Sequence, residues 1–235
     1  MDQPVAVPEA ALRLLVERGF DATSVDQLAE VLGMSRSTFF RRYGSKEDMV
    51  FADMDGVIEA VRAILATPGR GLEDRVATAA LSVFDHHSGS RGASLLRFRL
   101  LQEVPALRDR ELVSTHRYER AFRRGMRAAR GIEPGLDPEN LAITAYAASV
   151  VAVHNAFLRS WLTTQDGGLR AGLAAELAAL ATLHRQRLEG ATAEPASGAP
   201  RPGPAVVVTI STSGTGTDEI LSAVRRALEE QDNPS

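Results

Sequence analysis

Basic side chains gather between residues 35 and 46 of this 235-residue chain. The segment holds four basic residues and no acidic one, although the whole chain has a formal net charge of −3. Guanidinium and hydroxyl groups bind phosphate oxygens and base edges, and aromatic or methyl groups can contact the thymine methyl group. The composition therefore predicts a surface for nucleic acid, although a solvated helix face would also fit. Its basic residues are Arg36, Arg41, Arg42 and Lys46, interleaved with Ser35, Ser37, Thr38, Phe39, Phe40 and Tyr43.

Two short helices around a glycine turn are expected to position these side chains. Thr23 or Ser24 can cap the first helix, because hydroxyl oxygens accept hydrogen bonds from free N–H groups at a helix start. Gly33 suits the end of that helix, where a left-handed residue is needed, and Ser35 can cap a second helix. Two helices joined by such a turn form a helix-turn-helix, whose second helix can enter the DNA major groove.

The run from Gly33 to Glu47 resembles the signature of the TetR family of bacterial one-component repressors. Gly19-Phe20 and Thr23-Ser24-Val25 match further positions upstream. The resemblance implies an all-α homodimer with an N-terminal DNA-binding domain and a C-terminal domain that binds an inducer. By position it implies operator contacts from Ser37, Thr38, Phe40 and Arg41, and phosphate contacts near Arg36, Arg42, Tyr43 and Lys46, with Thr23, Ser24 and Ser35 on the same DNA-binding surface.

Three features depart from the family pattern. Phe40 replaces the tyrosine usual at that position, which removes a hydroxyl contact to phosphate. Arg42 stands where histidine or tyrosine is more common. The segment before the first helix, Met1 to Pro4, has no basic arm that could reach a minor groove. These departures bear more on the expected affinity for DNA than on the expected class of protein.

Apolar periodicity predicts an all-α fold in two domains. Residues 1–45 are expected to form a three-helix DNA-binding domain, and residues 46–189 a helical domain for ligand binding and dimerisation. Residues 88–92 read as a loop. The expected helices are Pro8–Arg18, the two of the helix-turn-helix, Lys46–Leu65, Leu72–His87, Ala93–Glu103, Leu107–Arg130, Asp137–Thr164 and Leu169–Leu188.

The last two expected helices carry stripes of small residues, such as Ala145, Ala148 and Ala152. Small side chains let helix axes approach closely. The pattern resembles the two helices with which the family builds a four-helix dimer interface. Packing within a single subunit is the alternative.

Residues 190–204 are rich in glycine, alanine and proline and read as a linker. Residues 205–235 are expected to form a β-strand followed by an α-helix, Ala205–Ile210 and Thr217–Glu230. One strand and one helix do not make a stable domain, so this extension must dock on the body, pair across a dimer or await a partner.

The expected effector site is an apolar cavity in the second domain. A lone histidine on an apolar helix is more often a hydrogen-bonded core residue, and the adjacent His86 and His87 should diverge and make a poor metal pair. Ten arginines between Arg97 and Arg130 form either a solvated face or an anion site. The wall candidates are Phe84, Phe98, Phe122, Tyr146, His154, Phe157 and Trp161.

The chain has no cysteine, which excludes disulfides and cysteine-ligated metal. No secretory signal pattern and no membrane-length apolar run is recognised, so a cytoplasmic protein without a membrane partner is expected. No cofactor, metal or catalytic residue is predicted.

The leading hypothesis is a repressor that binds a double-stranded operator as a homodimer and is released by a small hydrophobic effector, either acyl or acyl-CoA in type or an aromatic drug-like molecule. The alternatives are a DNA-binding regulator without ligand control and a helical small-molecule enzyme.

Overall fold

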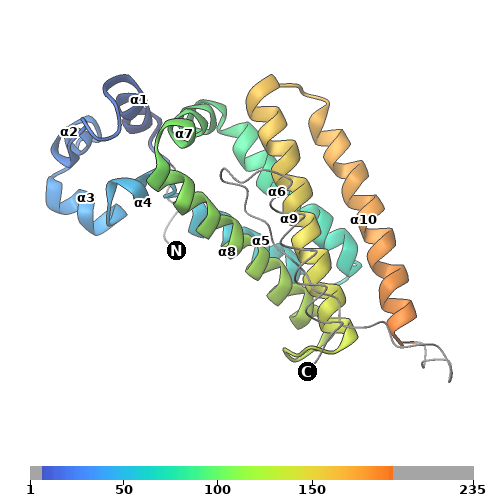
Figure 1. The fold of residues 1–235 in the computed structure, drawn as a ribbon. Coiled ribbons are helices and arrows are strands. Elements are labelled where there is room, and N and C mark those ends of the chain that lie inside the picture. The colour runs from blue at the N-terminus through green and yellow to red at the C-terminus, as the bar shows by residue number, and fades with distance from the viewer. Residues whose placement is uncertain (1–6, 193–235) are drawn as a thin grey trace, which may run out of the picture. The chain divides into compact units, whose positions relative to one another are not determined.

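The computed structural model describes residues 7–192, and within that range it contains helices and no strand. This confirms the all-α prediction. The predicted linker beyond residue 192, the βα extension at 205–235 and the first residues of the chain lie outside the described residues. The helices are α1 (Glu9–Arg18), α2 (Val25–Val31), α3 (Arg36–Tyr43), α4 (Lys46–Val50), α5 (Met54–Ala66), α6 (Leu72–Gly89), α7 (Arg91–Glu103), α8 (Pro105–Arg130), α9 (Pro138–Thr164) and α10 (Leu169–Thr192) (Figure 1).

The first three helices form as the local sequence predicts. Ser24 caps α2 in a reciprocal capping box with Gln27. The Ser35 hydroxyl accepts a hydrogen bond from the Thr38 backbone N–H at 3.2 Å and so caps α3. Gly33 between them has a φ of 63°, which a side chain would strain. The turn therefore fixes how α3 sits against α2.

The predicted single helix Lys46–Leu65 is wrong, because the chain breaks into α4 and α5 at residues 51–53. Phe51 and Ala52 donate to carbonyls only three residues back, so the α-helical pattern is lost. Asp53 is 6% exposed, and its carboxylate is held by side chains of α6 and α7. These tertiary contacts interrupt the helix at a place where the local sequence contains no helix-breaking residue.

The second domain is built around α8 and α9. Helix α5 packs against α6 and α8, α9 packs against α8 and α10, and α1 of the first domain packs on α7 (Figure 1). A Cβ on Gly125 of α8 would lie 2.5 Å from a methyl group of Leu65, so glycine allows α5 and α8 to approach closely. The buried core is continuous from α1 to α10.

Two predicted boundaries need correction. The loop expected at residues 88–92 is a single non-helical residue, Ser90, between α6 and α7. Helix α10 continues to Thr192, three residues into the predicted linker. In both places the helical backbone tolerates glycines that composition alone would assign to a loop.

Helix α9 is long and apolar enough to cross a membrane by length and composition, which the sequence reading did not expect. It packs against α6, α7, α8 and α10, and its buried residues include Ile143, Val150 and Trp161. Such a helix is also typical of a protein core, so this feature is weak evidence for a membrane span.

Candidate nucleic-acid interface and inner cavity

Helix α3 presents one exposed face and one buried face. Phe39 and Tyr43 are buried and their rings pack with centroids 5.1 Å apart. The opposite face carries Ser37, Phe40 and Arg41, and Phe40 is 42% exposed although it is aromatic. A polar and aromatic face on the second helix of a helix-turn-helix suits base contacts in a major groove.

Several predicted DNA contacts prove to be structural. Thr23 is 1% exposed, and its hydroxyl donates to the Gly19 carbonyl at 2.7 Å, so its predicted place on the DNA-binding surface is wrong. The Tyr43 ring is committed to the core of the domain. Ser24 and Ser35 are exposed, but their hydroxyls cap α2 and α3. They orient the helices. Arg41 is exposed, and Ser37 is exposed with its hydroxyl 3.0 Å from that of Ser35 in a hydrogen bond.

Lys46 turns its ammonium group toward its own domain. The Nζ atom donates to the Phe20 carbonyl at 2.5 Å and to the Thr23 carbonyl at 3.2 Å. It also lies 4.2 Å from the centre of the Phe20 ring, within cation–π range. A phosphate contact from Lys46 stays a prediction, and it would have to use the third N–H of the ammonium group.

The remaining basic residues of the surface are exposed. Arg36 forms an ion pair with Asp26 of α2 at 2.9 Å, and its guanidinium lies over the Phe40 ring. Arg42 lies over the Tyr43 ring. Exposed pairs of this kind contribute little stability, so both guanidinium groups can exchange their contacts for phosphates.

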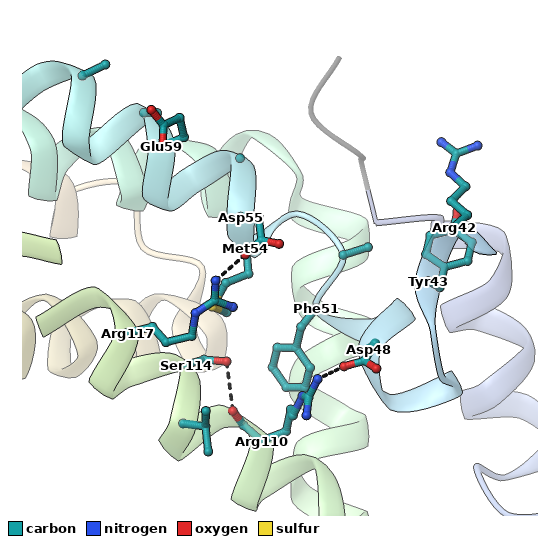
Figure 2. A pocket seen from close by; sticks show the side chains of 15 residues that line it. Arg42, Tyr43, Asp48, Phe51, Met54, Asp55, Glu59, Arg110, Ser114 and Arg117 are labelled. Atoms are coloured by element: carbon teal, nitrogen blue, oxygen red, sulfur yellow. Dashed lines mark hydrogen bonds and ion pairs between the residues drawn. The ribbon is translucent and has the colours of Figure 1, made fainter. Parts of the chain in front are cut away.

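A groove of about 760 Å³ lies between the first domain and helices α5 and α8. We call it the outer groove. Arg110 of α8 pairs with Asp48 of α4, and Arg117 of α8 pairs with Asp55 of α5 (Figure 2). The Arg110–Asp48 pair joins the second domain to α4, the helix that follows α3. The groove is lined by Arg42, Tyr43, Asp48, Phe51, Ala52, Met54, Asp55, Gly56, Glu59, Ala60, Ala63, Arg110, Val113, Ser114 and Arg117.

A second, smaller cavity lies inside the second domain, and we call it the inner cavity. It measures about 80 Å³ and is bounded by α7, α8 and α9 and by the break after α4. A neighbouring void of about 10 Å³ shares Tyr118, His154 and Asn155 with it and continues to Val83, Phe122 and Val151. The inner cavity is lined by Phe51, Met54, His87, Ser94, Arg97, Phe98, Leu101, Glu111, Ser114, Thr115, Tyr118, His154, Asn155, Leu158 and Leu162.

The predicted cavity residues separate into three groups. Phe98, Phe122 and His154 line the inner cavity or the void beside it. Phe84 and Trp161 pack edge to face with ring centroids 6.2 Å apart and do not line either space. Tyr146 and Phe157 do not line the inner cavity and face α10, and Tyr146 lines a separate groove of about 140 Å³ between α9 and α10. The Tyr146 ring stacks on His184 at 4.2 Å, and Phe157 lies against Gly172.

A buried ion cluster borders the inner cavity. One terminal nitrogen of Arg97 donates to both Asp53 oxygens, at 3.0 and 2.9 Å, and His86 Nε2 donates to Asp53 at 2.8 Å. Burial would raise the pKa of Asp53, but the hydrogen bond from His86 and the charge of Arg97 hold it well below its usual range. Asp53 therefore stays a carboxylate at neutral pH and ties the break after α4 to α6 and α7.

The expectation that His86 and His87 diverge is wrong. Their ring centroids lie 5.4 Å apart, and ligand atoms of both fall within 4.8 Å of one another and of an Asp53 oxygen. Two imidazoles and a carboxylate could hold a divalent metal. The Arg97 guanidinium already neutralises that carboxylate, so a cation would have to displace it.

The histidines of the inner cavity are neutral near pH 7. Burial, together with the charge of Arg97, lowers the pKa of His87 to about 3. Burial likewise lowers the pKa of His154 to about 4. Burial raises the pKa of Tyr118, so its hydroxyl keeps its proton. The cavity therefore offers neutral polar groups beside one basic residue, Arg97, and one acidic residue, Glu111.

Arg97, Tyr118 and Asn155 escaped the sequence-based selection. Arg97 stood within an arginine-rich segment whose other members are mostly exposed, and nothing local distinguishes the buried one. Tyr118 and Asn155 lie on the faces of α8 and α9 that line the cavity. Only the tertiary structure shows which faces these are. The heptad-like spacing of Val151, Leu158 and Leu162 was the signal in the sequence that could have indicated the cavity-lining face of α9.

These observations define a helix-turn-helix domain joined to a helical domain with an internal cavity. The family described as bacterial regulatory proteins, tetR family, matches residues 9–52. The HTH-type transcriptional regulator TcmR of Streptomyces glaucescens is 36% identical over 55 residues, which cover 23% of this chain and 24% of that protein. An uncharacterised HTH-type regulator of Mycobacterium bovis is 38% identical over 60 residues, 26% and 28% of the two chains. The chain thus aligns with about a quarter of these relatives' length.

Solved structures extend the likeness in fold to the second domain. A transcriptional regulator of Pseudomonas aeruginosa superposes with a TM-score of 0.52 at 18% identity, covering 76% of this chain and 90% of that one. FadR of Bacillus subtilis, solved in complex with stearoyl-CoA, gives 0.51 at 16% identity, covering 75% and 94%. Residues 9–52 thus match the tetR family of bacterial regulatory proteins, and the described residues as a whole share the helical fold of these solved regulators.

Proposed function

We propose that the protein is a transcriptional repressor that binds a double-stranded operator and is released by a small molecule in the inner cavity. The observation that carries the DNA-binding part is the exposed Ser37–Phe40–Arg41 face of α3, held in place by two capped helices. The inner cavity beside the α4–α5 break, with its mixed apolar and polar lining, supports the ligand-responsive part. An acyl or acyl-CoA effector stays a prediction, and a cavity of about 80 Å³ is small for one.

A homodimer through α9 and α10 forms part of the proposal. The small-residue stripes are exposed on both helices, at Ala145, Ala148 and Ala152 of α9 and at Ala175 and Ala178 of α10. Leu141 and Leu183 are also exposed, at 46% and 62%. Ala145 and Leu183 line the groove between α9 and α10, and the exposure of Ala148, Ala152, Ala175 and Ala178 in the single chain favours the dimer over the alternative.

Selection from a random duplex library with the full-length protein tests the DNA-binding part. We expect a near-palindromic sequence whose half-sites are one helical turn or a multiple of it apart, about 34–36 Å or more between centres. A Ser37→Ala, Arg41→Ala double variant should lose the enrichment while keeping the melting temperature. Failure of the unmodified protein to enrich any sequence would contradict the proposal.

A further inference from the structure

Two polar atoms at the inner cavity are buried and have no hydrogen-bond partner. They are Nε of Arg97, a residue 8% exposed, and Nε2 of His154, which is 7% exposed. Buried polar atoms are normally paired, and leaving one unpaired costs about 1–3 kcal/mol. Arg97, which lines the cavity, uses a terminal nitrogen for Asp53, so its Nε–H is a donor without a partner.

The other polar groups of the wall include acceptors, His154 Nε2 and the Glu111 side chain, and hydroxyl donors on α8. Tyr118 lines both the inner cavity and the neighbouring void, and its hydroxyl stays protonated because burial raises its pKa. Thr115 lies one helical turn before Tyr118 on α8 and contributes a second hydroxyl. An oxygen acceptor on a ligand would therefore meet several donors from α7 and α8.

The charges of the wall argue against an anionic ligand. The formal charges of Arg97 and Glu111, which both line the cavity, cancel, and the guanidinium is already shared with the carboxylate of Asp53. A ligand carboxylate would add an unpaired negative charge beside Asp53 or would have to break the buried Asp53–Arg97 pair. Breaking such a pair costs about 3–5 kcal/mol. A neutral oxygen acceptor binds the spare donor without this penalty.

Size and shape restrict the ligand further. The inner cavity of about 80 Å³ is smaller than the engineered cavity of about 150 Å³ that binds benzene in another protein. Beyond Tyr118, His154 and Asn155, the adjoining void is walled by the apolar residues Val83 and Val151. The space therefore suits a compact molecule with one polar end and one apolar end.

Resting on the proposed effector role of this cavity, we propose that it takes a compact neutral molecule that presents a carbonyl oxygen to Arg97 and Tyr118 and an apolar body to Val83 and Val151. This excludes a carboxylate or phosphate group from the cavity. It also gives the ligand a direct contact with Arg97, the residue that holds Asp53 at the α4–α5 break.

Three probes of equal size and branching separate the possibilities: 3-methyl-2-butanone with a carbonyl, isobutyrate with a carboxylate, and 2,3-dimethyl-1-butene with an alkene. Each would be titrated into the full-length protein, and NMR would follow the Arg97 Nε–H and the methyl groups of Val83 and Val151. We expect the ketone to bind more tightly than the other two by about tenfold for each of the two hydrogen bonds that it accepts, from Arg97 and from Tyr118.

Tyr118→Phe should weaken ketone binding by about tenfold and leave alkene binding unchanged, because it removes a donor and keeps the ring. Tyr146→Phe is the matched control, since that tyrosine faces His184 on α10, and it should change neither. Equal binding of ketone and alkene, tighter binding of isobutyrate, or no binding of any probe would each overturn the proposal.

Operator affinity measured with and without the ketone separates this inference from the proposed function. Selective, Tyr118-dependent ketone binding with no change in operator affinity would leave the site intact and refute its effector role. Release of the operator by other compounds, with no ketone binding, would leave the proposed function intact and refute the neutral-carbonyl site.

Discussion

Arg41 is the residue on α3 best placed to read a base. It is exposed on the same face as Ser37 and Phe40, and among the described residues it has no salt-bridge partner. Arg41→Ala should change the preferred base at one position of each half-site and cost about 1–3 kcal/mol at that position. Operator affinities measured against a library of single substitutions would test this. Arg62→Ala, which removes an exposed arginine of α5, should leave the preference unchanged.

A uniform loss across all operator variants would assign Arg41 to phosphate instead. Phosphate contacts position the protein and carry no sequence information. In that case the salt dependence of binding would fall by about one unit of slope. The two roles therefore differ in two independent measurements.

His154 should make stability fall as the solution becomes acidic. Its pKa is lowered from 6.5 to about 4 by burial, so below pH 6.5 the unfolded chain takes up a proton that the folded protein refuses. Stability is then full above pH 6.5 and is lost between pH 6.5 and 4, by about 3 kcal/mol for this residue. His154→Gln should make that part of the profile shallower in urea unfolding at pH 4.5, 5.5, 6.5 and 7.5, and His87, whose pKa is also lowered by burial, should account for slope that remains.

The exposed His116 of α8 provides the control for that experiment. His116→Gln should leave the slope as in the unmodified protein. An identical slope in the His154 variant would show that the histidine is not the titrating group. Asp53 also weakens the fold in acid, but only at lower pH, because its pKa lies below its usual range.

At the scale of elements, the features set by neighbouring residues could be predicted from the sequence. Ser24, Ser35 and Gly33 act within a turn or two of their own positions, so caps and the helix-turn-helix followed from residue type and spacing. The break at residues 51–53 could not be predicted, because it depends on Arg97, 44 residues away in sequence. Long-range pairing of this kind leaves no local signal.

The cavity residues show the same division. Helix α9 is central and is covered on more than one face, so aromatic residues at helical spacing do not reveal which face meets a cavity. His154 faces α7 and α8, whereas Tyr146 and Phe157, on a neighbouring face of the same helix, meet α10. Which residues of α9 line the cavity and which meet α10 depends on the position of α10, and that position could not be predicted from the sequence.

The exposed stripe of α9 gives a direct test of the dimer. Ala148→Arg would place a charged side chain at a close helix–helix contact, where burying it unpaired is costly. Light scattering at micromolar concentration should then report a monomer. Ala10→Arg, at an exposed alanine of α1, should stay dimeric. A monomer before any substitution would contradict the interface.

At the scale of the whole molecule, the proposed function requires that the proposed ligand and DNA sites are coupled through contacts between the two groups of helices. Helix α8 carries Glu111 and Tyr118 of the inner cavity, and it carries Arg110, whose guanidinium pairs with Asp48 of α4 across the outer groove (Figure 2). The Asp53–Arg97 pair and the packing of α1 on α7 are the parallel connections. A shift of α8 on ligand binding would therefore reach the helix that follows α3.

Arg110→Ala should weaken this coupling without emptying the cavity. A partly exposed ion pair contributes about 0.5–1 kcal/mol, so the ratio of operator Kd values with and without 3-methyl-2-butanone should shrink by about two- to fivefold. Binding of the ketone to the free protein should not change. Arg117→Ala removes the pair with Asp55, which joins α8 to α5 inside the second domain, and should leave the ratio intact. If both variants lower the ratio equally, coupling runs through the position of α8 as a whole, and the Arg110–Asp48 contact has no special part in it.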